Sequence, residues 1–181
     1  MKISKGGKLL LLGIALVVVD QVIKVLVKTN MSIGESFNVI GDWFRILFVE
    51  NEGMAFGMKF GGAVGKFILS LLRIALCGLL VWWISSLNRK GKAPVGVLVG
   101  LTLITAGAFG NIIDCLFYGL IWDYAPLMFG KVVDMFYFPL IHNAAGEVVF
   151  FSPVFNFADS CVTVGAFYLI LFQWKFFASD D

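Results

Sequence analysis

The residues best suited to chemistry are four aspartates that lie in or beside long apolar segments: Asp20, Asp114, Asp134 and Asp159. Charged side chains in such segments are energetically expensive and usually face the interior of a helix bundle. Few cations are available to neutralise them, and a surplus of carboxylates at low dielectric implies at least one raised pKa. Two carboxylates that share one proton can act as acid and base on a water molecule, so these residues predict acid–base hydrolysis.

Other polar residues accompany the aspartates, and each has a simpler interpretation. Asp20 and Lys24 are four positions apart on one helical face, and we favour the interpretation that they neutralise each other. Asn111 and Asn156 can equally form hydrogen bonds between helices. Arg73 is the one charge in its apolar segment, and the sequence leaves open whether it extends toward the membrane surface or pairs with a carboxylate.

The composition defines the class of protein that must position these residues. Of the 181 residues, 60% are hydrophobic and 14% are charged, whereas a soluble domain has about 25% charged residues. These values exclude an ordinary soluble domain and a disordered chain. A net charge of +2 is too weak to collect phosphates, so we expect no nucleic-acid partner. The remaining class is an integral membrane protein.

Four apolar segments are each close to the roughly 20 residues that a helix needs to cross a bilayer. They are 9–27, 67–87, 93–113 and 154–177. The first follows three lysines like a signal peptide, but no small-x-small cleavage site comes after it, so we interpret it as a retained span. The sequence therefore predicts an all-α integral membrane protein with four transmembrane helices, in a single membrane domain covering residues 1–181.

The basic residues predict the orientation of these helices. The N-terminal tail and the loop 88–92 each carry three, whereas the long loop 28–66 has four in 39 residues and 114–153 has only Lys131. Because cytoplasmic loops hold the excess of Lys and Arg, we expect both termini inside and both long loops outside. Segment 37–49 is rich in β-branched and aromatic residues, so we expect a small extracytoplasmic sheet there. In this orientation the polar candidates all fall near the outer face.

Five short motifs add a more specific signal. In chain order they are Asp20-Gln21-x-x-Lys24, Asn51-x-Gly53-x-Ala55-Phe56, Gly107-Ala108-x-Gly110-Asn111-x-x-Asp114, Val132-Val133-Asp134 and Phe155-Asn156-x-Ala158-Asp159-Ser160. One such motif alone is weak evidence, but five in order across nearly the whole chain are specific. With them the chain resembles the bacterial lipoprotein signal peptidases, also called signal peptidase II.

The resemblance implies an intramembrane aspartic endopeptidase of the bacterial cytoplasmic (inner) membrane. The implied substrate is a prolipoprotein with diacylglycerol on its lipobox cysteine, which is cut just before that cysteine, and the implied inhibitors are globomycin-type compounds. The catalytic dyad of the family corresponds here to Asp134 and Asp159. The positions that match residues shaping or supporting the site are Asp20, Lys24, Asn51, Gly53, Asn111, Asp114, Asn156 and Ala158.

Two departures from the family pattern concern the loop 114–153. The family usually has arginine directly after the aspartate of its Asn-x-x-Asp motif, and this chain has Cys115. The role of that arginine either passes to Arg73, Lys24 or Lys131, or is lost. The loop is also longer than usual, which indicates either a longer lid over the site or a decoration particular to this species.

Two other classes of function compete with this interpretation. A proton- or ion-coupled transporter also uses intramembrane Asp and Lys, but it usually has polar groups near the midplane and paired repeats, and neither is visible here. A non-catalytic assembly or lipid-binding protein would not need a surplus of carboxylates. We expect no cofactor, and the single histidine, His142, argues against a zinc site. Membrane lipid is an expected partner, and because the polar cluster closes within one chain we expect a monomer.

Overall fold

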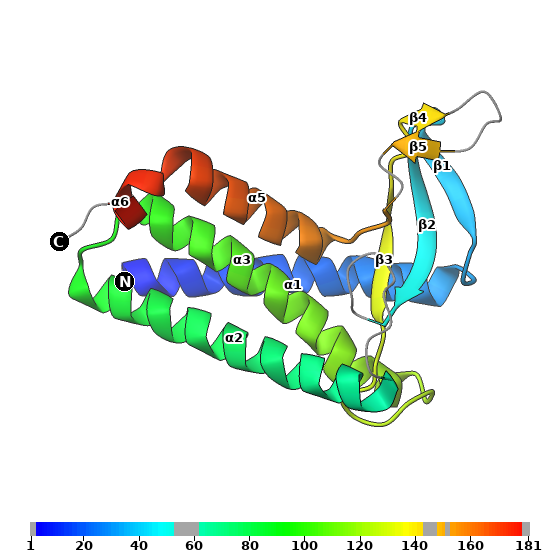
Figure 1. Cartoon of the computed structure of the whole chain (residues 1–181), viewed down its shortest axis with the longest axis horizontal. Helices are drawn as coiled ribbons and strands as arrows, with labels where there is room; N and C mark the ends of the chain where they lie inside the picture. The colour runs from blue at the N-terminus through cyan, green and yellow to red at the C-terminus, as the bar shows by residue number, and fades with distance from the viewer. Residues whose placement is uncertain (1–2, 53–61, 143–147, 151–152, 179–181) are drawn as a thin grey trace.

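The computed structural model describes residues 3–52, 62–142, 148–150 and 153–178. Long helices form a bundle, and small sheets cover one of its ends (Figure 1). The helices are α1 (Lys5–Asn30), α2 (Gly62–Lys90), α3 (Val95–Ile113), the π-helical segment η2 (Asp114–Tyr118), α4 (Gly119–Ile121), α5 (Phe157–Phe172) and α6 (Trp174–Ala178). The described N- and C-terminal ends and the α2–α3 connection all lie at the end away from the sheets.

Helix α3 is the central helix of the bundle, because α1, α2 and α5 all pack against it. Small residues allow α5 to approach closely: a Cβ at Gly107 would lie 2.3 Å from the carbonyl oxygen of Ala158, and one at Gly100 would lie 2.5 Å from the side chain of Leu169. Small residues at a helix interface permit such close packing. The same approach brings the first turn of α5 against the end of α3.

The sheet next to the bundle has three antiparallel strands in the order β1 (Ser36–Ile40), β2 (Phe44–Asn51) and β3 (Val132–Tyr137). The expected strands in 37–49 are therefore confirmed as β1 and β2, and the turn between them contains Gly41 at a φ of 50°. Strands β4 (Ile141–His142) and β5 (Val148–Phe150) form a separate pair. An antiparallel bridge between Phe136 and Phe155 links β3 to the start of α5.

Within the part of the chain that the structure describes, three helices are long and apolar enough to cross a membrane: α1, α2, and the continuous helix Val95–Ile121 made of α3, η2 and α4. Helices α1 and α2 extend beyond the expected spans 9–27 and 67–87 at both ends. The third helix likewise continues past residue 113, the expected end of its span, to Ile121. Asp114 keeps helical backbone angles, with φ of −59° and ψ of −51°, and its carboxylate is paired with Lys24 at 2.8 Å.

The fourth predicted span, 154–177, is shorter in the structure. Helix α5 has 16 residues, which is about 24 Å at 1.5 Å per residue. It begins only at Phe157 because Asn156 is its N-cap, and it ends before Gln173, after which α6 begins as a separate short helix. It is apolar but falls below the length of the other three helices.

Candidate functional site

Asp134 and Asp159 lie on two elements that meet at the sheet end of the bundle. Asp134 is in β3, and Asp159 is in the first turn of α5. Backbone hydrogen bonds between Phe136 and Phe155, of 2.7 and 3.1 Å, hold the strand against the segment that leads into the helix. Asp134 is only 3% exposed, while Asp159 is half-buried. The two carboxyl groups therefore differ in their access to water.

Two asparagine amides connect these carboxyl groups. Asn156 Nδ2 donates to Asp134 Oδ1 at 2.7 Å and to Asn111 Oδ1 at 3.0 Å. Asn111 Nδ2 in turn donates to Asp159 Oδ1 at 2.8 Å. Asn156 is fully buried and both orients Asp134 and helps to orient the amide that holds Asp159. The two aspartates thus belong to one hydrogen-bonded group.

The local sequence explains why Asn156 and Asp159 are so well fixed. Asn156 is the N-cap of α5, and its Oδ1 accepts from the backbone N–H of Asp159 at 2.9 Å. The Asp159 carboxylate accepts from the backbone N–H of Asn156 at 3.3 Å, which completes a capping box. The spacing Asn-x-x-Asp therefore starts the helix and positions both side chains at the same time.

Asn51, on β2, also contacts the buried carboxyl group of Asp134. Its Nδ2 donates to Asp134 Oδ2 at 3.2 Å. With Asn156 on Oδ1, each oxygen of Asp134 accepts from an amide. Gly53, which belongs to the same motif, lies outside the described residues.

Lys24 is the centre of a buried group of charges behind the two aspartates. Its Nζ contacts Asp20 Oδ2 at 2.9 Å, Asp114 Oδ2 at 2.8 Å and Asn111 Oδ1 at 2.9 Å. The three charged residues are at most 1% exposed. The expected pairing of Asp20 with Lys24 is confirmed, but Lys24 is shared with a second carboxylate and with the amide that holds Asp159.

Asp20 and Asp114 also fix the backbone around the site. Asp20 Oδ1 accepts from the backbone N–H of Ala158 at 2.9 Å, in the first turn of α5. Asp114 Oδ2 accepts from the backbone N–H of Val133 at 3.3 Å, next to Asp134. Gly110 leaves room for this arrangement, because a Cβ there would lie 2.5 Å from Asp20 Oδ2. The two carboxylates bound to Lys24 therefore each hold the element that carries one of the two candidate catalytic residues.

Sequence reasoning missed two members of this cluster, Gln21 and Tyr118. Gln21 Nε2 donates to Asp114 Oδ1 at 2.9 Å and to the carbonyl oxygen of Gly110 at 3.1 Å. Its Oε1 accepts from the hydroxyl of Tyr118 at 3.1 Å. Gln21 was visible in the first sequence motif, whereas Tyr118 lies in the helical extension that was expected to be a loop.

The charges and burial around Asp134 change its acidity. Burial raises its pKa from 3.8 to about 7, and the nearby negative charge of Asp159 acts in the same direction. The amide hydrogen bonds from Asn51 and Asn156 oppose this shift because they favour the ionised form. Near neutral pH, a substantial part of the Asp134 population is therefore protonated.

Arg73, on α2, contacts the residue that follows Asp114. Its Nη1 donates to Cys115 Sγ at 3.1 Å. Among the described residues its hydrogen-bond partner is this thiol, which is neither of the two alternatives that the sequence left open. The other two cations considered for this position are engaged elsewhere: Lys24 with its carboxylates, and Lys131 with Glu50 at 3.4 Å.

Comparisons with known proteins agree with this geometry. The family model described as "Signal peptidase (SPase) II" matches residues 12–175. A lipoprotein signal peptidase from Porphyromonas gingivalis is 42% identical, with 94% of this chain and 84% of that protein covered. One from Amoebophilus asiaticus is 36% identical, with coverages of 88% and 75%. A bacterial membrane enzyme solved by the in meso method superimposes with a TM-score of 0.69 at 30% identity, over 93% of this chain and 88% of that one.

Proposed function

The chain belongs to the signal peptidase II family, and we propose that it removes signal peptides from prolipoproteins by an aspartic mechanism in which Asp134 and Asp159 share one proton. The main support for this proposal is structural: the side-chain amides of Asn156 and Asn111 join the two carboxyl groups in one hydrogen-bonded group. The named relatives are lipoprotein signal peptidases, and none of these findings favours the transport hypothesis.

The two aspartates take different roles because their environments differ. Asp134 is buried with a raised pKa, so it holds the shared proton and acts as the acid. Asp159 is the more exposed of the two and accepts hydrogen bonds from an amide and a backbone N–H, so it acts as the base. Carboxyl groups whose environments separate their acidities are suited to this division.

The chemical steps follow from these roles. Asp159 takes a proton from a water molecule as the water oxygen bonds to the carbonyl carbon of the scissile peptide. Asp134 gives its proton to the carbonyl oxygen, which yields a neutral tetrahedral intermediate. Asp159 then passes its proton to the amide nitrogen, Asp134 recovers a proton from the intermediate, and the C–N bond breaks. The dyad ends with one proton, as it began.

The finer features of the proposal concern topology and substrate. We place four spans in a single membrane unit, with α5 as the fourth, both termini in the cytoplasm and the site near the outer face of the cytoplasmic membrane. The substrate carries diacylglycerol on the cysteine after the cut, the enzyme is a monomer, and globomycin-type compounds inhibit it. The family resemblance supports the substrate and the inhibitor, and the distribution of Lys and Arg supports the orientation.

We propose that Arg73 supplies the positive charge that the family usually obtains from an arginine directly after the aspartate that corresponds to Asp114. Its guanidinium reaches the Cys115 side chain from the neighbouring helix α2, so positive charge is delivered close to that position from another element. The thiol is only a weak acceptor and does not neutralise the guanidinium.

The test of the proposed function is cleavage by the purified protein in detergent. A lipobox peptide with a diacylglyceryl cysteine should be cut immediately before that cysteine, and the same peptide without the lipid should be cut far more slowly. Failure to cut the lipidated peptide would contradict the activity. Equal rates on both peptides would contradict the lipid requirement and leave the peptidase activity standing.

A further inference from the structure

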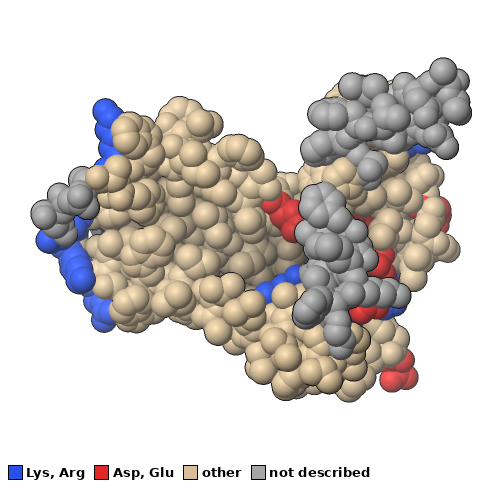
Figure 2. All heavy atoms as spheres, in the orientation of Figure 1, with Lys and Arg blue, Asp and Glu red and all other residues tan. Residues whose placement is uncertain are grey.

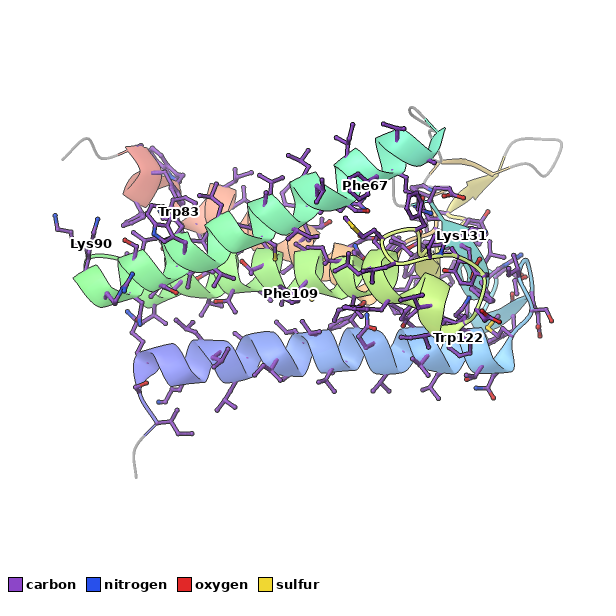
Figure 3. The ribbon with its side chains drawn as sticks, turned by 90° about the horizontal axis from the view of Figure 1, so that it is seen from below. Phe67, Trp83, Lys90, Phe109, Trp122 and Lys131 are labelled. Atoms are coloured by element: carbon purple, nitrogen blue, oxygen red, sulfur yellow. The ribbon has the colours of Figure 1, made fainter. Side chains whose placement is uncertain are left out.

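A groove outside the site runs along the bundle between α1, α2 and α3. It has a volume of about 440 Å³ and extends from Gly6 and Asn88, at the end away from the sheet, to Ile113. It exists because α1 and α2 both pack on α3 but hardly touch each other. Figure 3 shows α3 between the other two helices, with Phe109 of α3 along the gap.

The walls of the groove are apolar over most of its length. The two threonines on α3 that line it, Thr102 and Thr105, donate their hydroxyl groups to the backbone carbonyls of Leu98 and Leu101, each at 2.7 Å. Their hydroxyl groups are therefore satisfied within the helix. Free polar groups occur mainly at the mouth, where Ser85 and Asn88 of α2 line the groove. Such a surface favours a hydrocarbon over a polar ligand.

The shape of the groove indicates a narrow occupant. Along α1 it runs from Gly6 to Val18, which is about 18 Å at the rise of an α-helix. Dividing the volume by this length gives a mean cross-section of about 24 Å², which corresponds to a channel about 5–6 Å across. A helix with its side chains is about 10–12 Å across. A groove of this length and cross-section matches a single extended hydrocarbon chain.

The charge at the mouth indicates what the hydrocarbon is attached to. Lys5 and Lys8 on α1 and Arg89 and Lys90 on α2 lie beside the mouth in sequence. Figure 2 shows Lys and Arg gathered at this end of the molecule, away from the sheet. Clusters of basic residues at a membrane surface attract anionic headgroups at about 1 kcal/mol per residue.

We propose that the groove binds one acyl chain of an anionic phospholipid of the cytoplasmic leaflet, with its phosphate at the basic mouth. Lipid binding in the groove is a separate property from the proposed peptidase activity, because the residues that line the groove are not those of the catalytic site. It rests on the orientation argued above, which places the mouth at the cytoplasmic face. The lipid fills the space between α1 and α2 that protein side chains leave open.

The first test needs no variant. The delipidated protein in detergent is mixed with dipalmitoyl phosphatidylglycerol or dipalmitoyl phosphatidylcholine, and bound lipid is counted by native mass spectrometry. We expect one tightly held lipid and a preference for the anionic headgroup of roughly thirtyfold, as two basic contacts would give. Equal binding of the two lipids, or no retained lipid, would overturn the proposal.

The second test fills the groove. Gly13 and Thr102 both line the groove, and a Cβ at Gly13 would meet Thr102 Cγ2 at an ordinary 3.6 Å, so Gly13→Leu adds a side chain at the groove wall without a clash at its Cβ. Gly78→Leu is the matched control, because a Cβ there meets nothing within 4 Å. We expect Gly13→Leu to lose the tightly held phosphatidylglycerol and Gly78→Leu to keep it. Equal retention, or equal loss, in the two variants would contradict the assignment.

Cleavage of the lipidated peptide separates this site from a subsite for substrate. In phospholipid-free detergent, Gly13→Leu should cut at the wild-type rate. If Gly13→Leu instead loses cleavage while it still binds phosphatidylglycerol, the groove belongs to the substrate, and the phospholipid proposal is wrong. Neither result depends on which residues perform the peptidase chemistry.

Discussion

The carboxylate of Asp20 accepts a hydrogen bond of 2.9 Å from the backbone N–H of Ala158, a residue 138 positions away. This contact places a negative charge from α1 at the N-terminus of α5, where the helix dipole favours it. The other oxygen of Asp20 contacts Lys24 at 2.9 Å. A single side chain therefore connects the buried lysine to the helix that presents Asp159.

Removal of the Asp20 carboxylate should weaken the start of α5. We expect Asp20→Ala to lower the free energy of unfolding by about 1–3 kcal/mol, because a buried backbone donor loses its partner. The cleavage rate should fall together with the stability. Asp20→Asn should retain more of both, because its amide oxygen can still accept the hydrogen bond from the backbone N–H of Ala158. Thermal denaturation in detergent and initial cleavage rates measure this, with exposed Asp42→Ala as the control. If Asp20→Ala is as stable as Asp42→Ala, the Asp20 carboxylate does not stabilise the start of α5.

Loss of the Lys24 charge should be more damaging. Lys24→Met leaves the buried Asp20 and Asp114 without their shared cation and should destabilise the protein by about 3–5 kcal/mol. The double variant Lys24→Met/Asp114→Asn should recover part of that stability, because one uncompensated charge is gone. Chemical unfolding measures both, with exposed Lys8→Met as the control. No recovery in the double variant would show that the charges are not what Lys24 stabilises.

The pH dependence of cleavage should report the proton on Asp134. Asp134 must be protonated to act as the acid, so kcat/KM should fall as pH rises through about 7. The hydrogen bond from Asn51 favours the ionised form, so Asn51→Ala should raise the pKa of Asp134 and move the alkaline limb to higher pH. Asn38→Ala, at an exposed position in β1, should leave the limb in place. A limb that moves to lower pH in Asn51→Ala would contradict the assignment of the acid.

The contact between Arg73 and Cys115 predicts a compensating pair of substitutions. Cys115→Ser keeps an acceptor for the guanidinium and should have nearly wild-type activity. Cys115→Arg places two guanidinium groups together and should lower both stability and activity, and the addition of Arg73→Leu should restore part of both. A double-mutant cycle on melting temperature and cleavage rate measures the coupling. Full loss of cleavage in Cys115→Ser would show a thiol-dependent mechanism instead.

The sequence allowed much of the site to be predicted because span orientation sets the depth of each residue. Asp20, Asp114 and Asp159 come from three helical segments, yet all were expected at one level, and the structure brings them together. The start of α5 was also readable in principle, since Asn156 and Asp159 have the spacing of a capping box. The prediction that this span begins at residue 154 overlooked that signal.

What the sequence did not predict depends on contacts between distant segments. The helix continues past Asp114, whose carboxylate is neutralised by Lys24 on another helix, a pairing that no local pattern encodes. The choice of Cys115 as the partner of Arg73 is set by how α2 packs on α3, which no local pattern encodes. The sharing of Lys24 between two carboxylates is likewise a tertiary property.

If Asp134 and Asp159 together perform the cleavage, replacement of either one by its amide should abolish it. Asp134→Asn and Asp159→Asn keep the shape of the side chain but remove the acid or the base. The measurement is the single-turnover rate on the diacylglyceryl lipobox peptide, with thermal denaturation to verify folding. We expect folded proteins whose rates fall by roughly 10²–10⁴-fold or more. Near wild-type turnover by either folded variant would contradict this expectation.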